Sequence, residues 1–138
     1  DKVNKVFLTV KNDDKPRAVA VAKSLADMGF RLIATRGTAA AINDAGVLCE
    51  VVNKVTEGRP HVVDLIKNND VCLVINTVEE RRNAIADSRQ IRTSALQARI
   101  TTFTTISGAE AAVEGMAYVD DLDVRSIQEL HLELANAT

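Results

Sequence analysis

The sequence predicts a parallel α/β domain, in which one sheet is covered by helices on both faces. Short β-branched runs alternate about five times with longer segments of helical spacing, which is the pattern of repeated strand–helix units. One of the runs, 71–75, is apolar without alternation, as is typical of a central strand buried on both faces. The 138 residues suffice for a single domain with a substantial core.

The first half of the chain is predicted to form three strands and two helices. The expected strands are 6–10, 31–35 and 47–52. Pro16 suits the first turn of a helix, and Gly29 ends that helix as a C′ glycine. A second helix is expected to begin at Gly37-Thr38 and to stop at Gly46. Strands and helices therefore alternate from the start.

The second half repeats this alternation after a polar segment, 53–60. Helical spacing favours helices over 61–68, 81–98 and 107–116, and the strand pattern favours 71–75, 100–103 and a weakly patterned strand near 118–124. Ser126 followed by Glu129 forms a capping box, which predicts a final helix. Together the two halves give five main strands in a mainly parallel sheet.

Composition excludes several classes of partner. Hydrophobic residues make up 46% of the chain and aromatic residues only 3%, so the core is aliphatic and stacking platforms for single-stranded nucleic acid are not expected. The net charge of −2 provides no basic field for DNA or a membrane surface. The longest apolar runs have five residues, far short of the ~20 that span a bilayer. We expect no nucleic-acid and no membrane partner.

Cysteine and histidine usage favours a reducing compartment and no metal. Cys49 and Cys72 lie in apolar runs and are expected to be small buried hydrophobes of a cytoplasmic protein. His61 and His131 are isolated, so no zinc-ligand spacing exists. The N-terminus lacks a signal-peptide pattern, and we expect the chain to be a piece of a longer protein.

The residues that follow the strands indicate where a ligand would bind, because ligands of open α/β sheets lie beyond the carboxyl ends of the strands. In Thr35-Arg36-Gly37-Thr38 a strand ends, a glycine allows a tight turn and a helix begins. The free N–H groups of that helix, with Lys15 and Lys54 from neighbouring loops, suit a phosphate monoester. The alternative interpretation is an ordinary turn and N-cap with solvated lysines.

Catalytic chemistry is not predicted. The expected crevice contains no pair of carboxylates for acid–base work and no nucleophile elbow. Arginines 81, 82, 89 and 92 are expected to lie on a solvated helix face, with a partner interface as the alternative.

A series of segments resembles a known family. The stretch 30–39 resembles the phosphate-binding signature of methylglyoxal-synthase-like domains. Segments 52–55, 57–61, 75–77 and 87–96, in that order, make the chain similar to the C-terminal allosteric domain of the large subunit of carbamoyl phosphate synthetase. The resemblance covers about 6–134. It implies a three-layer, flavodoxin-like fold and a single effector-binding domain over 1–138.

The resemblance also implies a function. In that family the domain regulates a glutamine-dependent ligase of arginine and pyrimidine biosynthesis. UMP inhibits and IMP activates at one overlapping site, while ornithine activates at a site shared with the neighbouring synthetase domain. The implied partners are the rest of the large subunit, the glutaminase small subunit and further copies in an oligomer. The domain itself would be non-catalytic and need no cofactor, whereas the full enzyme uses ATP with Mg or Mn.

The resemblance implies roles for individual residues. The implied effector-site residues are Thr9, Lys15, Thr35, Gly37, Thr38, Lys54, Asn76, Asp87, Ser88 and Ile91, with Thr104 at the ornithine interface. The lysines and Thr35 and Thr38 would contact phosphate, Asn76 the ribose, and Ile91 the base. Two positions depart from enterobacterial members of the family. Arg36 replaces a histidine, and Val78 replaces a residue that carries a hydroxyl group.

Two rival functions stay open at this stage. One is a methylglyoxal-synthase-type lyase that removes phosphate from dihydroxyacetone phosphate, although the acidic catalytic residues of that enzyme are missing from the matching loops. The other is an oligomerisation module whose effector site has decayed.

Overall fold

A computed structural model describes residues 4–53, 61–68, 70–79 and 82–120. The elements, in chain order, are β1 (Lys5–Thr9), a short 3₁₀ helix η1 (Asn12–Asp14), α1 (Lys15–Asp27), β2 (Arg31–Ala34), α2 (Arg36–Asp44), β3 (Glu50–Val51), α3 (Val62–Lys67), β4 (Leu73–Asn76), α4 (Arg82–Gln97), β5 (Thr101–Phe103) and α5 (Ile106–Asp120). Strands and helices alternate as the sequence predicts.

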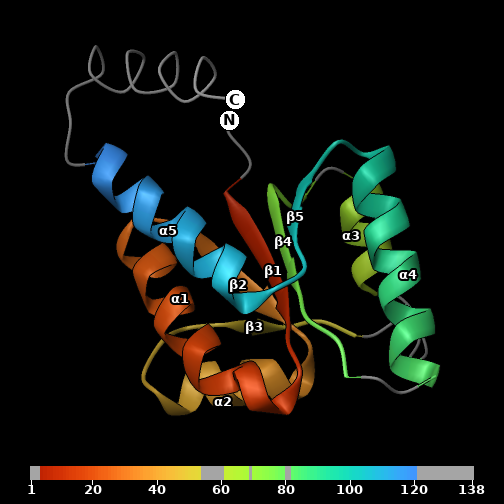
Figure 1. Ribbon diagram of the computed structural model, residues 1–138, viewed down its shortest axis with the longest axis horizontal. Helices are drawn as coiled ribbons and strands as arrows, with labels where there is room; N and C mark the ends of the chain where they lie inside the picture. Colours follow the sequence, from red (N-terminus) through yellow and green to blue (C-terminus); the bar gives the residue numbers. More distant parts are fainter. Residues whose placement is uncertain (1–3, 54–60, 69, 80–81, 121–138) are drawn as a thin grey trace.

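The five strands form one parallel sheet in the order β3-β2-β1-β4-β5 (Figure 1). The first strand of the chain is therefore the central one, and Phe7 pairs with Ile33 on one side and Val74 on the other. All four residues of β4 are buried and the strand lies between β1 and β5, which confirms that the run 71–75 forms an inner strand covered on both faces.

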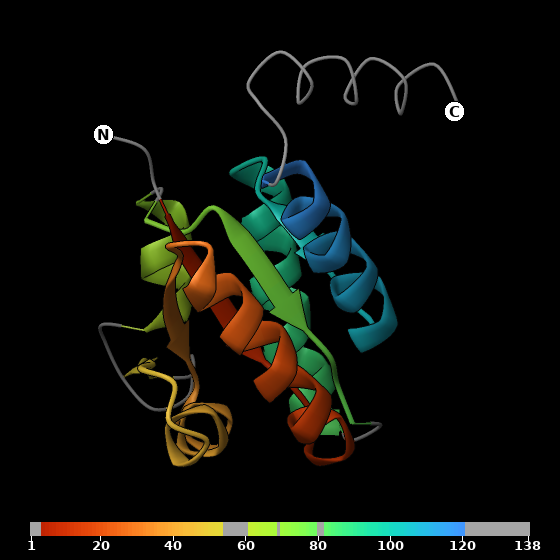
Figure 2. The ribbon, with the colours of Figure 1, turned by 90° about the vertical axis from the view of Figure 1, so that its left-hand side faces the viewer.

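Helices cover both faces of the sheet. In Figure 2, α1 and α5 lie across the face that carries α2, while α3 and α4 lie on the opposite face. Side chains of β1 alternate between the two cores. Leu8 packs with Leu25 and Ile42 under the first set of helices, and Phe7 packs with Ile66 under the second. The three-layer α/β fold is thus confirmed.

Two local predictions need correction, and a third is not tested. The edge strand β3 has two residues instead of six, because Leu48 and Val51 are 87% and 57% exposed and apolar burial does not hold an edge strand there. Residues 118–120 continue α5 and are not a strand, since propagating a helix adds a hydrogen bond per residue while a new strand needs a free sheet edge. The predicted helix from Ser126 lies outside the described residues.

The two cysteines differ in burial. Cys49 is buried, as predicted, but Cys72 is only partly buried. Both are free thiols and both precede a strand, β3 and β4 respectively. Over the described ranges, no helix is both long and apolar enough to cross a bilayer.

Candidate functional site

The carboxyl edge of the sheet brings together polar residues that are far apart in the sequence. Thr9 ends β1 and pairs in register with Asn76 at the end of β4. On the other side, the Thr35 hydroxyl donates to the Thr9 hydroxyl over 3.0 Å. Three of the predicted site residues, from three neighbouring strands, therefore meet at one point, as expected for a parallel sheet.

Lys15 lies against the first turn of α2. A Cβ placed on Gly37 would lie only 3.0 Å from the Lys15 ammonium nitrogen, so glycine leaves the space that this ammonium uses. Thr35 precedes α2 in an extended conformation but makes no capping hydrogen bond with its side chain. The hydroxyl bonds to Thr9 instead. A cation and the positive end of a helix dipole thus converge, which favours an anion.

Buried oxygens at this edge already accept hydrogen bonds from the protein. The Thr38 hydroxyl accepts from the Val10 N–H over 3.2 Å, and the Thr77 hydroxyl accepts from the Lys11 N–H over 3.0 Å. Both threonines are almost fully buried. Each hydroxyl also carries one proton. Because its oxygen accepts from a backbone N–H, this proton is still available for donation to another acceptor. The edge is consequently suited to a ligand rich in acceptor oxygens.

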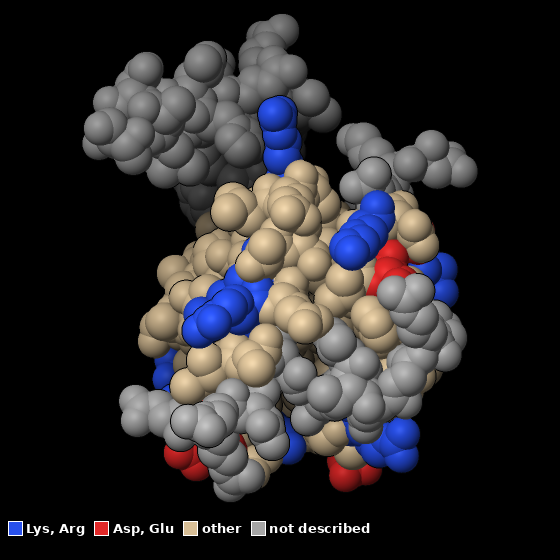
Figure 3. All heavy atoms as spheres, turned by 90° about the vertical axis from the view of Figure 1, so that its right-hand side faces the viewer, with Lys and Arg blue, Asp and Glu red and all other residues tan. Residues whose placement is uncertain are grey.

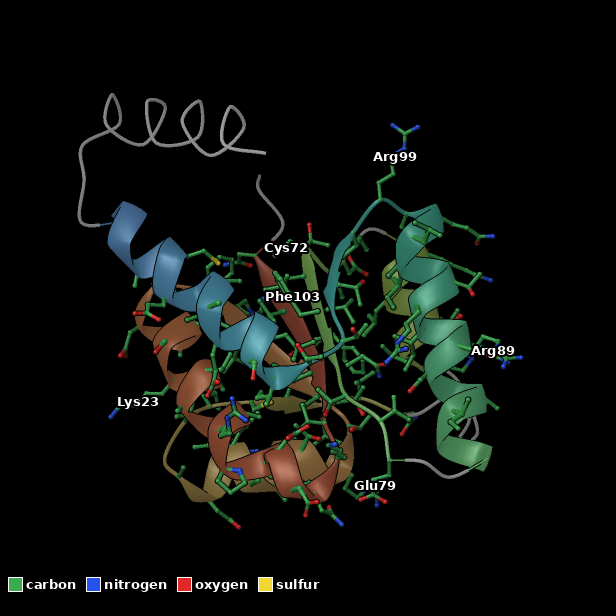
Figure 4. The ribbon with its side chains drawn as sticks, in the orientation of Figure 1. Lys23, Cys72, Glu79, Arg89, Arg99 and Phe103 are labelled. Atoms are coloured by element: carbon green, nitrogen blue, oxygen red, sulfur yellow. The ribbon has the colours of Figure 1, made fainter. Side chains whose placement is uncertain are left out.

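The nearby loops modulate this positive site. The Lys15 ammonium donates to the Asn12 side-chain oxygen over 2.6 Å, and an ammonium has two further protons to donate. The Glu79 carboxylate accepts from the Asn12 N–H at 3.5 Å, and Figure 4 shows its side chain at the outer rim of this end of the molecule. The Glu79 carboxylate is therefore turned toward η1.

Arg92 extends the site onto α4. Its Nε donates to the Asn76 side-chain oxygen over 3.0 Å, and one of its terminal nitrogens donates to the Asn76 carbonyl at 3.4 Å. Arg92 is exposed, as predicted for a solvated helix face, but its long side chain also reaches back to the end of β4. Arg89, in contrast, points away from the sheet (Figure 4).

A hollow of about 310 Å³ opens beside α4, next to Arg92. Its walls are Val78, Ile85, Ser88, Arg89, Arg92 and Thr93. Figure 3 views this side of the molecule, where Lys and Arg side chains stand apart among uncharged atoms. The hollow has apolar and polar walls within reach of the anion-binding edge, as a base or sugar would need.

The structure places the remaining predicted residues in different surroundings. Ser88 is buried and lines the hollow. Ile91 does not line it, because its side chain is 4% exposed and packs in the core with Phe7 and Val74. Thr104 follows the edge strand β5 and is exposed. Lys54 and the side chain of Asp87 lie outside the described part of the chain, so their predicted roles stay predictions.

Two residues of the site were missed from the sequence. Thr77 directly follows Asn76 and was noted as a polar residue after that strand, but it was not counted among the site residues. Arg92 is four residues after Ser88, so both lie on one side of the helix, but that spacing does not show that the Arg92 side chain reaches Asn76.

Comparison with known proteins identifies the family. A family model described as an MGS-like domain matches residues 17–104. The chain belongs to the MGS-like domain family. It is 57% identical over 129 residues to the carbamoyl phosphate synthase large chain of Ralstonia nicotianae, covering 94% of this chain and 12% of that protein. It is 48% identical over 132 residues to the same protein of Xanthomonas axonopodis pv. citri, covering 96% and 12%.

A solved structure agrees on the fold. The crystal structure of methylglyoxal synthase from Elizabethkingia anophelis superposes with a TM-score of 0.62 at 18% identity, over 80% of this chain and 76% of that one. At this identity the likeness shows the MGS-like fold alone. The chain spans only 12% of the length of the carbamoyl phosphate synthase large chains that it matches.

Proposed function

We propose that this chain is the effector-binding regulatory domain of a carbamoyl phosphate synthase large chain, and that it holds a nucleoside monophosphate by its phosphate at the start of α2. The observation that carries this proposal is the position of the Lys15 ammonium against the first turn of α2. Its nitrogen lies only 3.0 Å from the point that a Cβ on residue 37 would occupy if that residue were not glycine. The high identity to two such large chains, over nearly the whole of this sequence, supports the same interpretation.

The shape of the site favours a nucleotide over a bare phosphate. The anion-binding edge and the hollow beside α4 are joined by Asn76, which Arg92 contacts from the hollow side. A ligand that fills both would have a phosphate at α2, a sugar over Asn76 and a base along α4. We propose UMP and IMP as the opposing effectors, with ornithine acting near Thr104 at the surface shared with the synthetase.

The proposed mechanism is linkage without chemistry. The site holds donors and cations and binds a phosphate ester without transforming it. An effector shifts the enzyme between two states only by binding one of them more tightly, and such coupling is typically about 1–3 kcal/mol. The ATP and the Mg or Mn of the whole enzyme would serve its synthetase parts, in the cytoplasm, with the small subunit supplying ammonia from glutamine.

Calorimetric titration of the protein with UMP, IMP and inorganic phosphate tests this proposal. Replacing Lys15 by Ala should weaken UMP and phosphate binding about tenfold or more, because a charged hydrogen bond is lost. Lys23→Ala is the matched control, since Lys23 lies on the same helix, is exposed, and points to solvent in Figure 4. It should leave both affinities unchanged.

Each rival function predicts its own outcome, the first in this titration and the second in a separate activity assay. A decayed site predicts no binding by the wild-type protein. A lyase predicts release of methylglyoxal from dihydroxyacetone phosphate, which the structural likeness to a methylglyoxal synthase makes worth assaying. Either result would overturn the proposal, as would equal effects of Lys15→Ala and Lys23→Ala.

A further inference from the structure

Asn76 is held by two contacts from one side chain. It ends β4 and is 1% exposed. Arg92, in the second half of α4, donates to the Asn76 side-chain oxygen over 3.0 Å and to its backbone carbonyl at 3.4 Å. One guanidinium therefore engages both oxygens of a nearly fully buried amide residue.

The chemistry of arginine fixes which end of the Asn76 amide faces it. A guanidinium has five N–H donors and no acceptor. The amide must therefore turn its oxygen toward Arg92 and its NH₂ group away. An unpartnered asparagine could present either end to a ligand, but this one turns its NH₂ group to the side away from Arg92, so a ligand on that side meets the donor end.

We infer that Arg92 is a positioning residue, which makes Asn76 an obligatory hydrogen-bond donor in the effector site. The inference rests on the proposed function and adds a rule for the ligand. The ligand must place an acceptor, such as a sugar hydroxyl oxygen, over Asn76, between its phosphate and the part that fills the hollow. A ligand with a C–H group at that point would leave a buried donor unpaired, which costs affinity.

A direct contact between Arg92 and the phosphate is the alternative role. The two roles differ in what a lysine at this position can replace. Lysine keeps the positive charge but lacks the planar fork that reaches both oxygens of Asn76. Arg92→Lys thus removes positioning while it preserves electrostatic attraction.

The experiment measures UMP and inorganic phosphate affinities for the wild-type protein and for Arg92→Lys, Arg92→Ala, Asn76→Ala and the Arg92→Ala, Asn76→Ala double variant. Positioning predicts that Arg92→Lys and Arg92→Ala each weaken UMP about tenfold while phosphate binding changes less than about twofold. It also predicts that Arg92→Ala has little further effect on UMP once Asn76 is Ala, because coupled residues are non-additive.

Other outcomes overturn the inference. Retention of UMP affinity in Arg92→Lys, with loss of both UMP and phosphate in Arg92→Ala, would show a direct charge contact. Full additivity in the double variant would show that the two residues act independently. Arg99→Lys is the matched control, since Arg99 lies beyond the end of α4 and points away from the molecule (Figure 4). It should behave as wild type.

A ligand-free measurement separates this inference from the proposed function. In a ¹⁵N–¹H spectrum, the side-chain NH₂ signals of Asn76 should move in Arg92→Lys and stay in place in Arg99→Lys. If the wild-type protein binds no nucleotide, the proposed function fails and the ligand rule fails with it. Unmoved Asn76 signals in Arg92→Lys would overturn the positioning role itself, whatever the protein binds.

Discussion

The two ends of the sheet are built differently. At the carboxyl end, Thr38, Asn76 and Thr77 are polar, almost fully buried and hydrogen-bonded to other parts of the protein. At the amino end, the Arg31–Glu50 ion pair is more than half exposed, and the residues entering β3 and β4 are the thiols Cys49 and Cys72. Buried polar groups need hydrogen-bond partners to avoid a cost in free energy, and the carboxyl end supplies such partners for Thr38, Asn76 and Thr77, as a binding site requires.

The largest expected effect on stability is at the carboxyl end. Thr38→Val removes the hydroxyl that accepts from the Val10 N–H and leaves a buried donor unpaired. We expect the free energy of unfolding to fall by about 1–3 kcal/mol, measured by urea denaturation. The same change at the exposed Thr101, which begins β5 at the amino end, should alter it by less than about 0.5 kcal/mol. Equal losses at both positions would remove the contrast.

A pair of glycine substitutions sharpens the comparison. Gly115 lies inside α5, and a Cβ there meets nothing within 4 Å. Gly115→Ala should therefore stabilise the protein by about 0.4–1 kcal/mol through the unfolded chain. Gly37→Ala places a methyl group against the Lys15 ammonium.

We expect Gly37→Ala to weaken phosphate binding several-fold, whereas Gly115→Ala leaves it unchanged. Calorimetric titration and thermal unfolding of the two variants check both effects. If both alanines raised stability equally and neither changed phosphate affinity, the close approach of Lys15 would have no functional meaning.

Removing the ion pair at the amino end should matter less. Arg31→Ala breaks the exposed contact with Glu50, 2.8 Å between nitrogen and oxygen. Exposed pairs contribute little because water and salt screen them. We expect a change below about 0.5 kcal/mol in urea denaturation, and none at high salt. A loss as large as that of Thr38→Val would contradict the contrast between the two ends.

The smallest effect is confined to alkaline solution. Burial, with a contribution from Glu50, raises the pKa of the Cys49 thiol to about 11 from its ordinary value of 9.0. Above pH 9 the unfolded chain therefore loses this proton before the folded chain does. The contribution of this thiol to the free energy of unfolding is fully present below pH 9 and is lost as the pH rises toward 11. Cys49→Ala should lose less stability than wild type between pH 9 and 11, measured by thermal unfolding.

Much of the fold could be predicted because local patterns and burial agree. The apolar run before Asn76 indicated a strand covered on both faces, and the structure has it between β1 and β5. The prediction of a long third strand failed because an edge strand is decided by which neighbours cover it, and periodicity does not contain that information. The extent of α5 failed because helix propagation outweighed a short β-branched signal.

The candidate site could be predicted only in part, for a related reason. Convergence of Lys15 with the start of α2 follows from parallel topology, since successive strand ends share one edge. Arg92 could not be found in this way, because an arginine on a helix surface has the same sequence signature whether its side chain enters solvent or extends to a neighbouring strand. Its role depends on side-chain direction, which only the three-dimensional structure provides.

The location of Thr9 and Asn76 on paired strands has a consequence for handling the protein. Because these strands form the middle of the sheet, the binding geometry disappears whenever the sheet dissociates. A ligand held there would bind the native chain and not the denatured one. By mass action it would then raise the melting temperature, and at a hundred times its dissociation constant it would add about 2.7 kcal/mol. Heating the protein with a panel of metabolites would thus report which of them it recognises.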